Sequence, residues 1–157
     1  MVYLRGDAIL RPAIQALIYR ILIMSELSIP EKYLDLLTSK PELAHLSTLM
    51  KDGRPQVTPI WFSYEEGLIV LNSAKGRVKD INMRARPQVA LSIVDSENSF
   101  RYVQIMGSVV DITEEGADDH IDLLAQKYLD KPRYPWRQPG EVRVIYRVKP
   151  ERVQVSG

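Results

Sequence analysis

The chain has 157 residues, 45% of them hydrophobic, and its net charge is +1. This length suits one domain, the composition excludes wholesale disorder, and the small net charge argues against a nucleic-acid-binding protein. Because there is no cysteine, a disulfide, a thiolate metal site and a cysteine nucleophile are excluded. The absence of cysteine also fits a cytoplasmic protein, which is the location we expect. The two histidines, His45 and His120, lie far apart, so we expect structural roles for both and no metal site.

Residues 13–24 form an apolar stretch that Arg20 interrupts. This stretch is shorter than the about 20 residues of a membrane-spanning helix, and no cleavage site of small residues follows it. We therefore expect neither a membrane protein nor a secretory signal. Met24 precedes a sequence typical of a domain start, so residues 1–23 are predicted to be an extension and residues 24–157 a single domain. The alternative is an additional amphipathic helix at a partner surface.

The first half of the domain predicts one short helix and three strands. Ser28 and Glu31 have the spacing of a capping box, which predicts a helix to about Ser39. Strands follow at 44–50, 56–64 and 68–72, with a hairpin at Asp52-Gly53 and a turn at 65–67. Pro59 cannot donate a ladder hydrogen bond, so the second strand should be an edge strand or carry a bulge.

The second half predicts two longer helices and three more strands. A helix is expected over 77–86, ended by Pro87, with Val78, Ile81 and Ala85 on its buried face. Strands at 88–95 and 101–113 lead to a helix over 114–129, a proline-rich loop and a last strand or strand pair over 142–155. Six strands with few helices predict a mostly β fold, either a small barrel or a curled antiparallel sheet.

A basic segment after the third strand favours an anion site. The strand runs into Asn72 and Ser73, and Gly76 then allows a close turn into a helix that begins with Arg77 and Lys79. The first turn of a helix attracts phosphate through free N–H groups and the macrodipole, and arginine matches phosphate oxygens with two donors. The alternative is a basic helix that faces only solvent.

The order of these features resembles the pyridoxamine 5'-phosphate oxidase-like family of flavin-binding split barrels, and in particular its branch that uses the deazaflavin coenzyme F420. The resemblance covers most of residues 29–155. It rests on the ordered series LSTLMKDGRPQVTPIWFSYEEGLIVLNSAKGRVKDINMRARPQVALSI and on the tail YPWRQPGEVRVIYRVKPERV. No segment resembles the C-terminal substrate-binding extension of true pyridoxamine phosphate oxidases, which argues against vitamin B6 oxidation.

The resemblance implies a six-stranded antiparallel split barrel that forms a homodimer with two cofactors at the dimer interface. By the same resemblance, the ring and ribityl chain would lie along Gln56, Thr58 and Pro59, and Asn72 and Ser73 would hydrogen-bond the ribityl chain or phosphate. The phosphate would be held by Arg77, Lys79 and Asn82, and Tyr102 would reach across from the partner subunit. Lys75 is left without a role.

The implied activity is F420-dependent hydride transfer to an unidentified small organic substrate, with no membrane or nucleic-acid partner. FMN is the alternative cofactor, in an oxidase or flavin reductase, and a third possibility is a flavin-binding protein without turnover. No acid–base pair stands out, so no catalytic residue is predicted. Trp61 and Phe62 are expected to belong to the core or interface, whereas Trp136 could anchor a lid or contact substrate.

Overall fold

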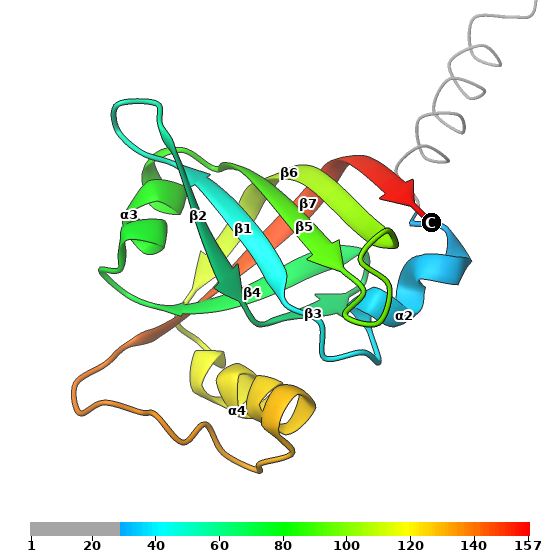
Figure 1. The fold of residues 1–157 in the computed structure, drawn as a ribbon. Coiled ribbons are helices and arrows are strands. Elements are labelled where there is room, and N and C mark those ends of the chain that lie inside the picture. The colour runs from blue at the N-terminus through cyan, green and yellow to red at the C-terminus, as the bar shows by residue number, and fades with distance from the viewer. Residues whose placement is uncertain (1–28) are drawn as a thin grey trace, which may run out of the picture.

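The computed structural model describes residues 29–157, which form a curled β-sheet with short helices at its two ends and a longer helix along one side (Figure 1). The predicted extension over 1–23 and the capping residue Ser28 lie outside the described residues. The first helical segment consists of η1 (Glu31–Tyr33) and α2 (Leu34–Leu37), with Pro30 at the N-cap. It is shorter than the helix predicted to Ser39, and it buries Tyr33, Leu36 and Leu37 against the barrel.

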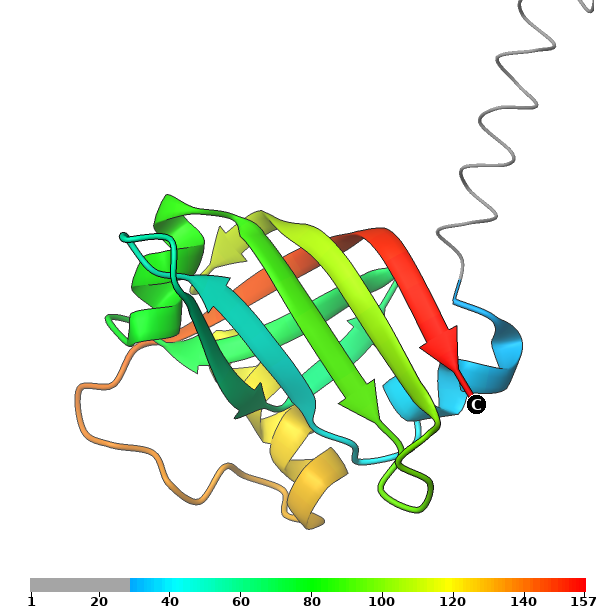
Figure 2. The same ribbon diagram turned by 45° about the horizontal axis from the view of Figure 1, so that its top comes forward.

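Seven antiparallel strands form one sheet in the order β2-β1-β5-β6-β7-β4-β3. The sheet curls on itself, as two views show (Figures 1 and 2), and gives the mostly β split barrel that the sequence predicted. Its inner face carries a core of alternating apolar side chains, among them Leu46, Leu91 and Ile105. The strands are β1 (Ala44–Leu49), β2 (Pro55–Ile60), β3 (Phe62–Glu65), β4 (Leu68–Ala74), β5 (Gln88–Val94), β6 (Tyr102–Thr113) and β7 (Arg143–Ser156).

The seventh strand arises because the predicted strand over 56–64 is broken at Trp61. Residues before the break pair with β1, where Pro59 lies opposite His45, and residues after it pair with β4 on the other edge of the sheet. β2 is an edge strand, as Pro59 predicted. The prediction of six strands was therefore wrong by one, since periodicity alone does not reveal that a chain leaves one edge for another.

Helix α3 (Val78–Ala85) covers one end of the barrel, and its buried face differs from the predicted one. Val78 and Ile81 are about half exposed, whereas the buried residues are Asp80, Asn82 and Met83. The helix thus turns polar side chains inward, because the barrel end offers them partners: the Tyr146 hydroxyl donates to Asp80, and Asn82 donates to Thr48. The prediction of an apolar buried face was wrong.

Helix α4 (Ala117–Leu129) lies outside β3, β4 and β7, and the loop 130–142 continues from it to β7 (Figure 1). Its buried face includes Ile121, Leu124 and Ala125. Tyr128 ties the helix to the barrel, since its hydroxyl donates to the Glu42 carbonyl at 2.8 Å. The helix therefore forms a fixed wall beside the broken strand.

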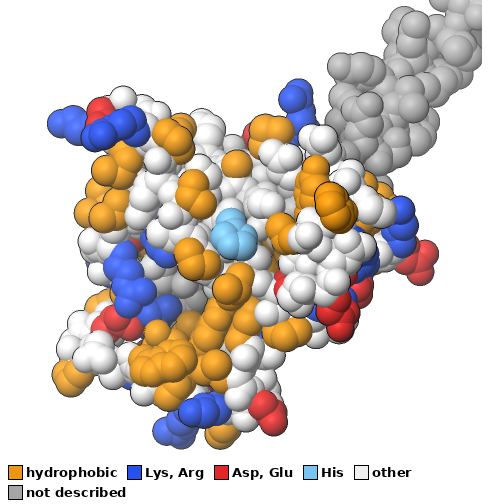
Figure 3. Space-filling model, in the orientation of Figure 1, with side chains coloured by type: hydrophobic (Ala, Val, Ile, Leu, Met, Phe, Trp, Pro, Cys, Tyr) orange, Lys and Arg blue, Asp and Glu red, His pale blue; other side chains and the backbone are white. Residues whose placement is uncertain are grey.

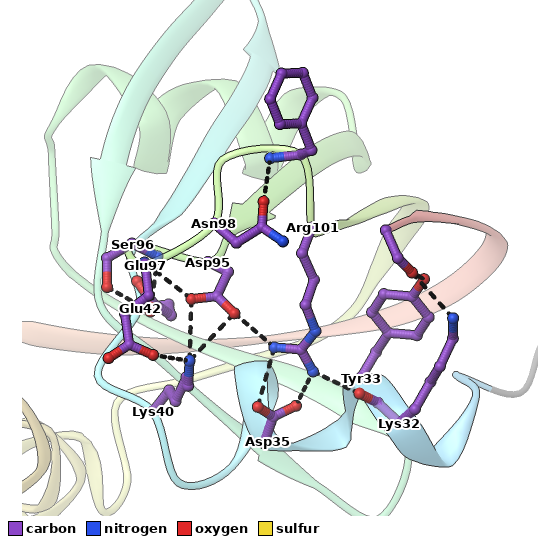
Figure 4. Close-up of polar contacts among 12 residues, drawn as sticks. Lys32, Tyr33, Asp35, Lys40, Glu42, Asp95, Ser96, Glu97, Asn98 and Arg101 are labelled. Carbon is purple, nitrogen blue, oxygen red and sulfur yellow. Dashed lines mark hydrogen bonds and ion pairs between the residues drawn. The ribbon is translucent and has the colours of Figure 1, made fainter.

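A network of ion pairs fastens the N-terminal helical segment to the β5–β6 loop (Figure 4). Arg101 pairs with Asp35 of α2 and, at 2.7 Å, with the buried Asp95, which Lys40 also contacts at 3.0 Å. Ser96 donates to Glu42 at 2.8 Å. Because each of these charged side chains has a partner inside the network, we assign it a structural role.

Lys127 of α4 gives a testable pH dependence of stability. Its ammonium group lies over the Phe62 ring and 3.2 Å from the Leu37 carbonyl, and burial lowers the pKa of Lys127 to about 8. Since an unfolded lysine titrates near 10.4, the unfolded state binds more protons between about pH 8 and 10, and stability should rise with pH there. Between pH 7.5 and 9.5 the free energy of unfolding should rise by about 1 kcal/mol more in the wild type than in Lys127→Met, as measured by urea unfolding.

The exposed Lys131, just beyond the same helix, supplies the matched control. Lys131→Met should keep the wild-type pH dependence. If wild type and Lys127→Met changed in parallel over this range, the buried amine would not be the cause.

Candidate functional site

A pocket with a volume of about 260 Å³ lies where β2, β4, the start of α3, α4 and the loop 130–142 meet. In the space-filling view, Lys and Arg side chains below α3 adjoin hydrophobic side chains over α4 and this loop (Figure 3). Trp61, the residue between β2 and β3, is among the residues that line this pocket. The lining residues are Leu43, Pro59, Ile60, Trp61, Asn72, Ser73, Arg77, Lys79, Ile121, Tyr134, Trp136 and Arg143.

One side of the pocket is basic. Arg77, Lys79 and Arg143 line it, and Glu141 pairs with Arg77 at 3.0 Å and with Arg143 at 2.9 Å. Lys79 has no ion-pair partner among residues 29–157. Burial lowers the pKa of Lys79, and the charges of Arg77 and Arg143 lower it further. Three cations against one carboxylate make this side suited to an anion, which would also favour the charged form of Lys79.

The floor of the pocket is formed by the end of β4, where Ser73 and Asn72 are both buried. The Ser73 hydroxyl has no hydrogen-bond partner within the described part of the chain. Asn72 accepts from Arg143 Nε at 2.8 Å and donates to the Ala117 carbonyl at 2.8 Å. Since buried hydroxyls are normally paired, the lone Ser73 hydroxyl is an exception at the floor of this pocket.

The carboxylate of Asp80 already accepts a hydrogen bond at the N-terminus of α3. Asp80 accepts the Gly76 N–H at 2.7 Å and pairs with Arg84 at 2.7 Å. The positive character of the pocket therefore comes from Lys79, Arg77 and Arg143 more than from the helix terminus that the sequence suggested.

The opposite side of the pocket is aromatic. Trp61 stacks on Tyr128 with ring centroids 5.1 Å apart, and Tyr134 and Trp136 meet Trp61 edge-on or tilted at 5.9 and 6.2 Å. Phe62 is fully buried in the core, as expected, whereas Trp61 and Trp136 line the pocket. The pocket thus combines a basic end with an aromatic wall, which suits a ligand that carries both an anionic group and a ring.

The structure brings together five of the nine predicted site residues, namely Pro59, Asn72, Ser73, Arg77 and Lys79. The other four, Gln56, Thr58, Asn82 and Tyr102, do not line this pocket.

Each of these four has a different position. Asn82 and Gln56 both contact Thr48 inside the barrel end, at 3.1 and 3.2 Å. The Thr58 hydroxyl on β2 is buried without a partner among the described residues. Tyr102 begins β6 opposite Ser156, at the other end of β7 from Arg143.

Arg143 and Tyr134 line the pocket but were not among the site residues predicted from the sequence. Arg143 is 5% exposed, lies in register with Ala74 at the end of β4, and its guanidinium stacks on Tyr134 at 5.3 Å. A signal was present, because an arginine directly before the apolar run Val144–Tyr146 is unusual at the start of a buried strand.

Two other kinds of site are absent within 29–157. No cluster of three or more histidine or acidic side chains could hold a metal ion in this part of the chain. No helix of the described residues has the length and apolar character needed to span a membrane.

The chain is similar to known proteins in both sequence and fold. The family described as Pyridoxamine 5'-phosphate oxidase matches residues 29–157. A solved structure described as an F420 reductase is 32% identical, covers 80% of this chain and 98% of its own, and superposes with a TM-score of 0.71. No curated protein matches the chain significantly.

Two more distant structures show the fold alone. A conserved hypothetical protein from Mycobacterium tuberculosis is 21% identical over 84% of this chain and 87% of its own, with a TM-score of 0.63. A putative pyridoxamine 5'-phosphate oxidase from Listeria innocua is 20% identical over 80% and 95%, with a TM-score of 0.60.

Proposed function

The chain belongs to the pyridoxamine 5'-phosphate oxidase family of split barrels, and on this basis we propose that it is an oxidoreductase that holds a flavin-type cofactor in the pocket beside β4 and α3. One observation carries the proposal. Lys79, which has no ion-pair partner among residues 29–157, and Ser73, whose hydroxyl is unpaired among the same residues, line the same pocket, and this pair of donors suits a phosphate-bearing ligand.

We propose coenzyme F420 as the cofactor, because the structure with 32% identity is described as an F420 reductase. An FMN-dependent oxidase or flavin reductase is the alternative, since FMN also carries a phosphate at the end of a ribityl chain. A protein that binds either cofactor without turnover is the third possibility. A cytoplasmic location is also part of the proposal.

The residues of the pocket fit the two ends of such a ligand. Lys79 and Arg77 would hold the phosphate, Ser73 would hydrogen-bond the phosphate or ribityl chain, and Pro59 would border the ring. Because both amide hydrogens of Asn72 already have partners, Asn72 would accept from a ribityl hydroxyl through its oxygen. The resemblance extends this set to Gln56, Thr58 and Asn82, which lie on β2 and the inner side of α3.

When bound, the deazaflavin would supply two-electron hydride transfer to an organic substrate. The contribution of this chain would be binding, orientation and shielding. The aromatic wall of Trp61, Tyr134 and Trp136 would exclude water from the ring, and the fixed cations would orient the anionic end. We assign no catalytic residue, and solvent would supply any proton.

We further propose that the chain acts as a homodimer, in which Tyr102 of each subunit contributes to the site of the other. The outer face of the sheet supports this, since Val57, Met106 and Val110 are exposed there. Light scattering at micromolar concentration should give the mass of a dimer, about 36 kDa from a chain mass of 18.0 kDa. A monomer that still binds the cofactor tightly would contradict this arrangement.

The cofactor carried by protein purified from its native host tests the proposed function. Its absorption spectrum and mass should identify F420, whereas FMN would support the alternative. Purified protein should then oxidise the reduced cofactor in the presence of an organic acceptor. A bound cofactor without turnover on a broad acceptor panel would leave only the binding function, and a ligand of another class would overturn the proposal.

A further inference from the structure

His120 lies behind the pocket and contacts β4, which lines the pocket, and the neighbouring strand β3. It is 6% exposed, on the face of α4 that packs on the sheet. Its Nδ1 atom is 3.2 Å from Asn72 Nδ2, and its Nε2 atom is 2.9 Å from the Ser63 hydroxyl. His120 therefore joins the floor of the pocket to the exposed end of β3.

Hydrogen bonds connect Glu65, Ser63, His120, Asn72 and Arg143 in series, and Arg143 fixes their direction at one end. A guanidinium group can only donate, so the Asn72 oxygen must face Arg143 Nε and the Asn72 amino group must face His120. That amino group also donates to the Ala117 carbonyl, which fixes the same orientation. His120 Nδ1 therefore accepts, and its Nε2 carries the proton of the neutral ring.

The contacts of Ser63 and Glu65, at the other end of this series of hydrogen bonds, agree with this tautomer. Nε2–H can donate to the Ser63 oxygen, because the Ser63 hydroxyl donates its own proton to Glu65 at 2.6 Å. Every member from Glu65 to Arg143 is thus satisfied only while His120 is neutral.

Protonation of His120 would reverse one of these contacts. A proton on Nδ1 would face the amino group of Asn72, and turning that amide would place its N–H groups against the Nε–H of Arg143. The Arg143 side chain would then lose its hydrogen bond to Asn72 of β4 and keep its contacts with Glu141 and the Tyr134 ring. The result would be a displaced cation at the basic side of the pocket.

We propose that neutral His120 is a positioning residue, which through Asn72 holds Arg143 in place for an anionic ligand, so that protonation of His120 weakens binding. This inference rests on the proposed function for its ligand, but the chain of contacts stands without it. A coupling of the usual size would make binding about fivefold weaker or more when His120 is protonated.

The groups around His120 favour the neutral form near pH 7. Burial lowers the pKa of His120, Arg147 and Arg143 of β7 lower it further, and Glu65 of β3, 3.9 Å away, opposes them. Ser63 and Asn72 are the polar neutral groups in contact. The change in binding should therefore fall below about pH 6.5, the ordinary value for histidine.

FMN titration between pH 5.0 and 8.0 compares wild type with two matched variants. His120→Asn offers an amide oxygen near the position of Nδ1 that does not titrate, and His45→Asn makes the same change at an exposed residue of β1. Because the FMN phosphate itself titrates near 6, the ratio of affinities between proteins is the quantity to read. Wild type and His45→Asn should lose about fivefold more affinity in acid than His120→Asn. Equal losses in all three would overturn the proposal.

The sign of the reciprocal effect separates this mechanism from direct attraction. A nearby anion would by itself raise the pKa of His120, whereas the proposed coupling requires bound sulfate or FMN to lower it by about 0.7, the logarithm of a fivefold coupling. An NMR titration of the two histidines, with and without ligand, reads this shift, with His45 as the internal reference. A rise would contradict the proposal.

One measurement needs no ligand, so it remains informative if the proposed function fails. In the free protein, the NMR signal of Arg143 Nε–H should shift with the titration of His120, and this shift should vanish in His120→Asn. An Arg143 signal that stays constant while His120 titrates would overturn the positioning role, whatever the pocket binds.

Discussion

Replacing Asp80 by alanine is expected to destabilise the protein by about 3 kcal/mol. The carboxylate accepts from the Tyr146 hydroxyl and the Gly76 N–H, and it pairs with Arg84. Tyr146 is fully buried, so its hydroxyl would lose its partner without gaining water. The buried Tyr146 hydroxyl left without a partner costs roughly 1–3 kcal/mol, and the lost charge-assisted bond from the Gly76 N–H adds to this. The exposed Arg84 stays solvated. Urea unfolding at pH 7 measures it.

Two comparisons make this test specific. Asp119→Ala removes an exposed carboxylate from α4 and should cost less than about 1 kcal/mol. In a Tyr146→Phe background, Asp80→Ala should cost less than in the wild type, because no hydroxyl remains unpaired. Equal costs in both backgrounds would show that the contact between Asp80 and Tyr146 contributes nothing.

The pH dependence of the Asp80 contribution has a fixed sign. Burial opposes ionisation, but hydrogen bonds from Tyr146, Gly76 and Arg84 outweigh it and lower the pKa of Asp80. A group whose pKa is lowered by folding stabilises the protein above its unfolded pKa of about 3.9. The difference between wild type and Asp80→Ala should therefore shrink as the pH falls below about 4.

Replacing Lys79 by methionine is expected to weaken cofactor binding by roughly ten- to a hundredfold. A charge-assisted hydrogen bond is worth about 1.5–3 kcal/mol, and Lys79 has no carboxylate partner among the described residues that would compensate for the loss of the ligand. Folding should change little, because the half-buried ammonium lies near Arg77 and Arg143, whose charges repel it. Fluorescence titration with F420 and FMN at fixed salt measures the affinity.

Lys75→Met is the matched control for this prediction, since it removes the same charge four residues away. Lys75 is exposed, pairs with Glu114 at 2.6 Å and does not line the pocket. Arg84 and Arg86 are less suitable controls, because each is bonded within the barrel end, to Asp80 and to the Leu49 carbonyl. Equal small losses for Lys75→Met and Lys79→Met would indicate that the helix is only a basic surface.

The strands and turns were predictable because each follows a local rule. The predicted strands over 44–50, 88–95 and 101–113 match β1, β5 and β6 to within one residue at each end, and Asp52-Gly53 predicted the first hairpin, where Gly53 has a φ of 84°. The break at Trp61 was not predictable in this way. It depends on which edge strand each half of the segment joins, and that is a property of the closed barrel.

The site was predictable on one side only. The basic residues after β4 follow a pattern in the sequence, and Arg77 and Lys79 lie together as that pattern suggested. The inward face of α3 was mispredicted, since amphipathicity assumes an apolar partner and the barrel end presents the Tyr146 and Thr48 hydroxyls. Arg143 comes from a strand 64 or more residues beyond them, so only the folded sheet brings it there.

Titration of the purified protein with F420 and with FMN, followed by fluorescence at fixed salt, tests the central claim most directly. The account predicts saturable binding of one cofactor per chain, tighter for F420 than for FMN, and competed by inorganic phosphate because Lys79, Arg77 and Ser73 hold the anionic end. If neither cofactor saturates a folded protein, or if phosphate leaves the affinity unchanged, the pocket beside β4 and α3 is not a flavin-type cofactor site.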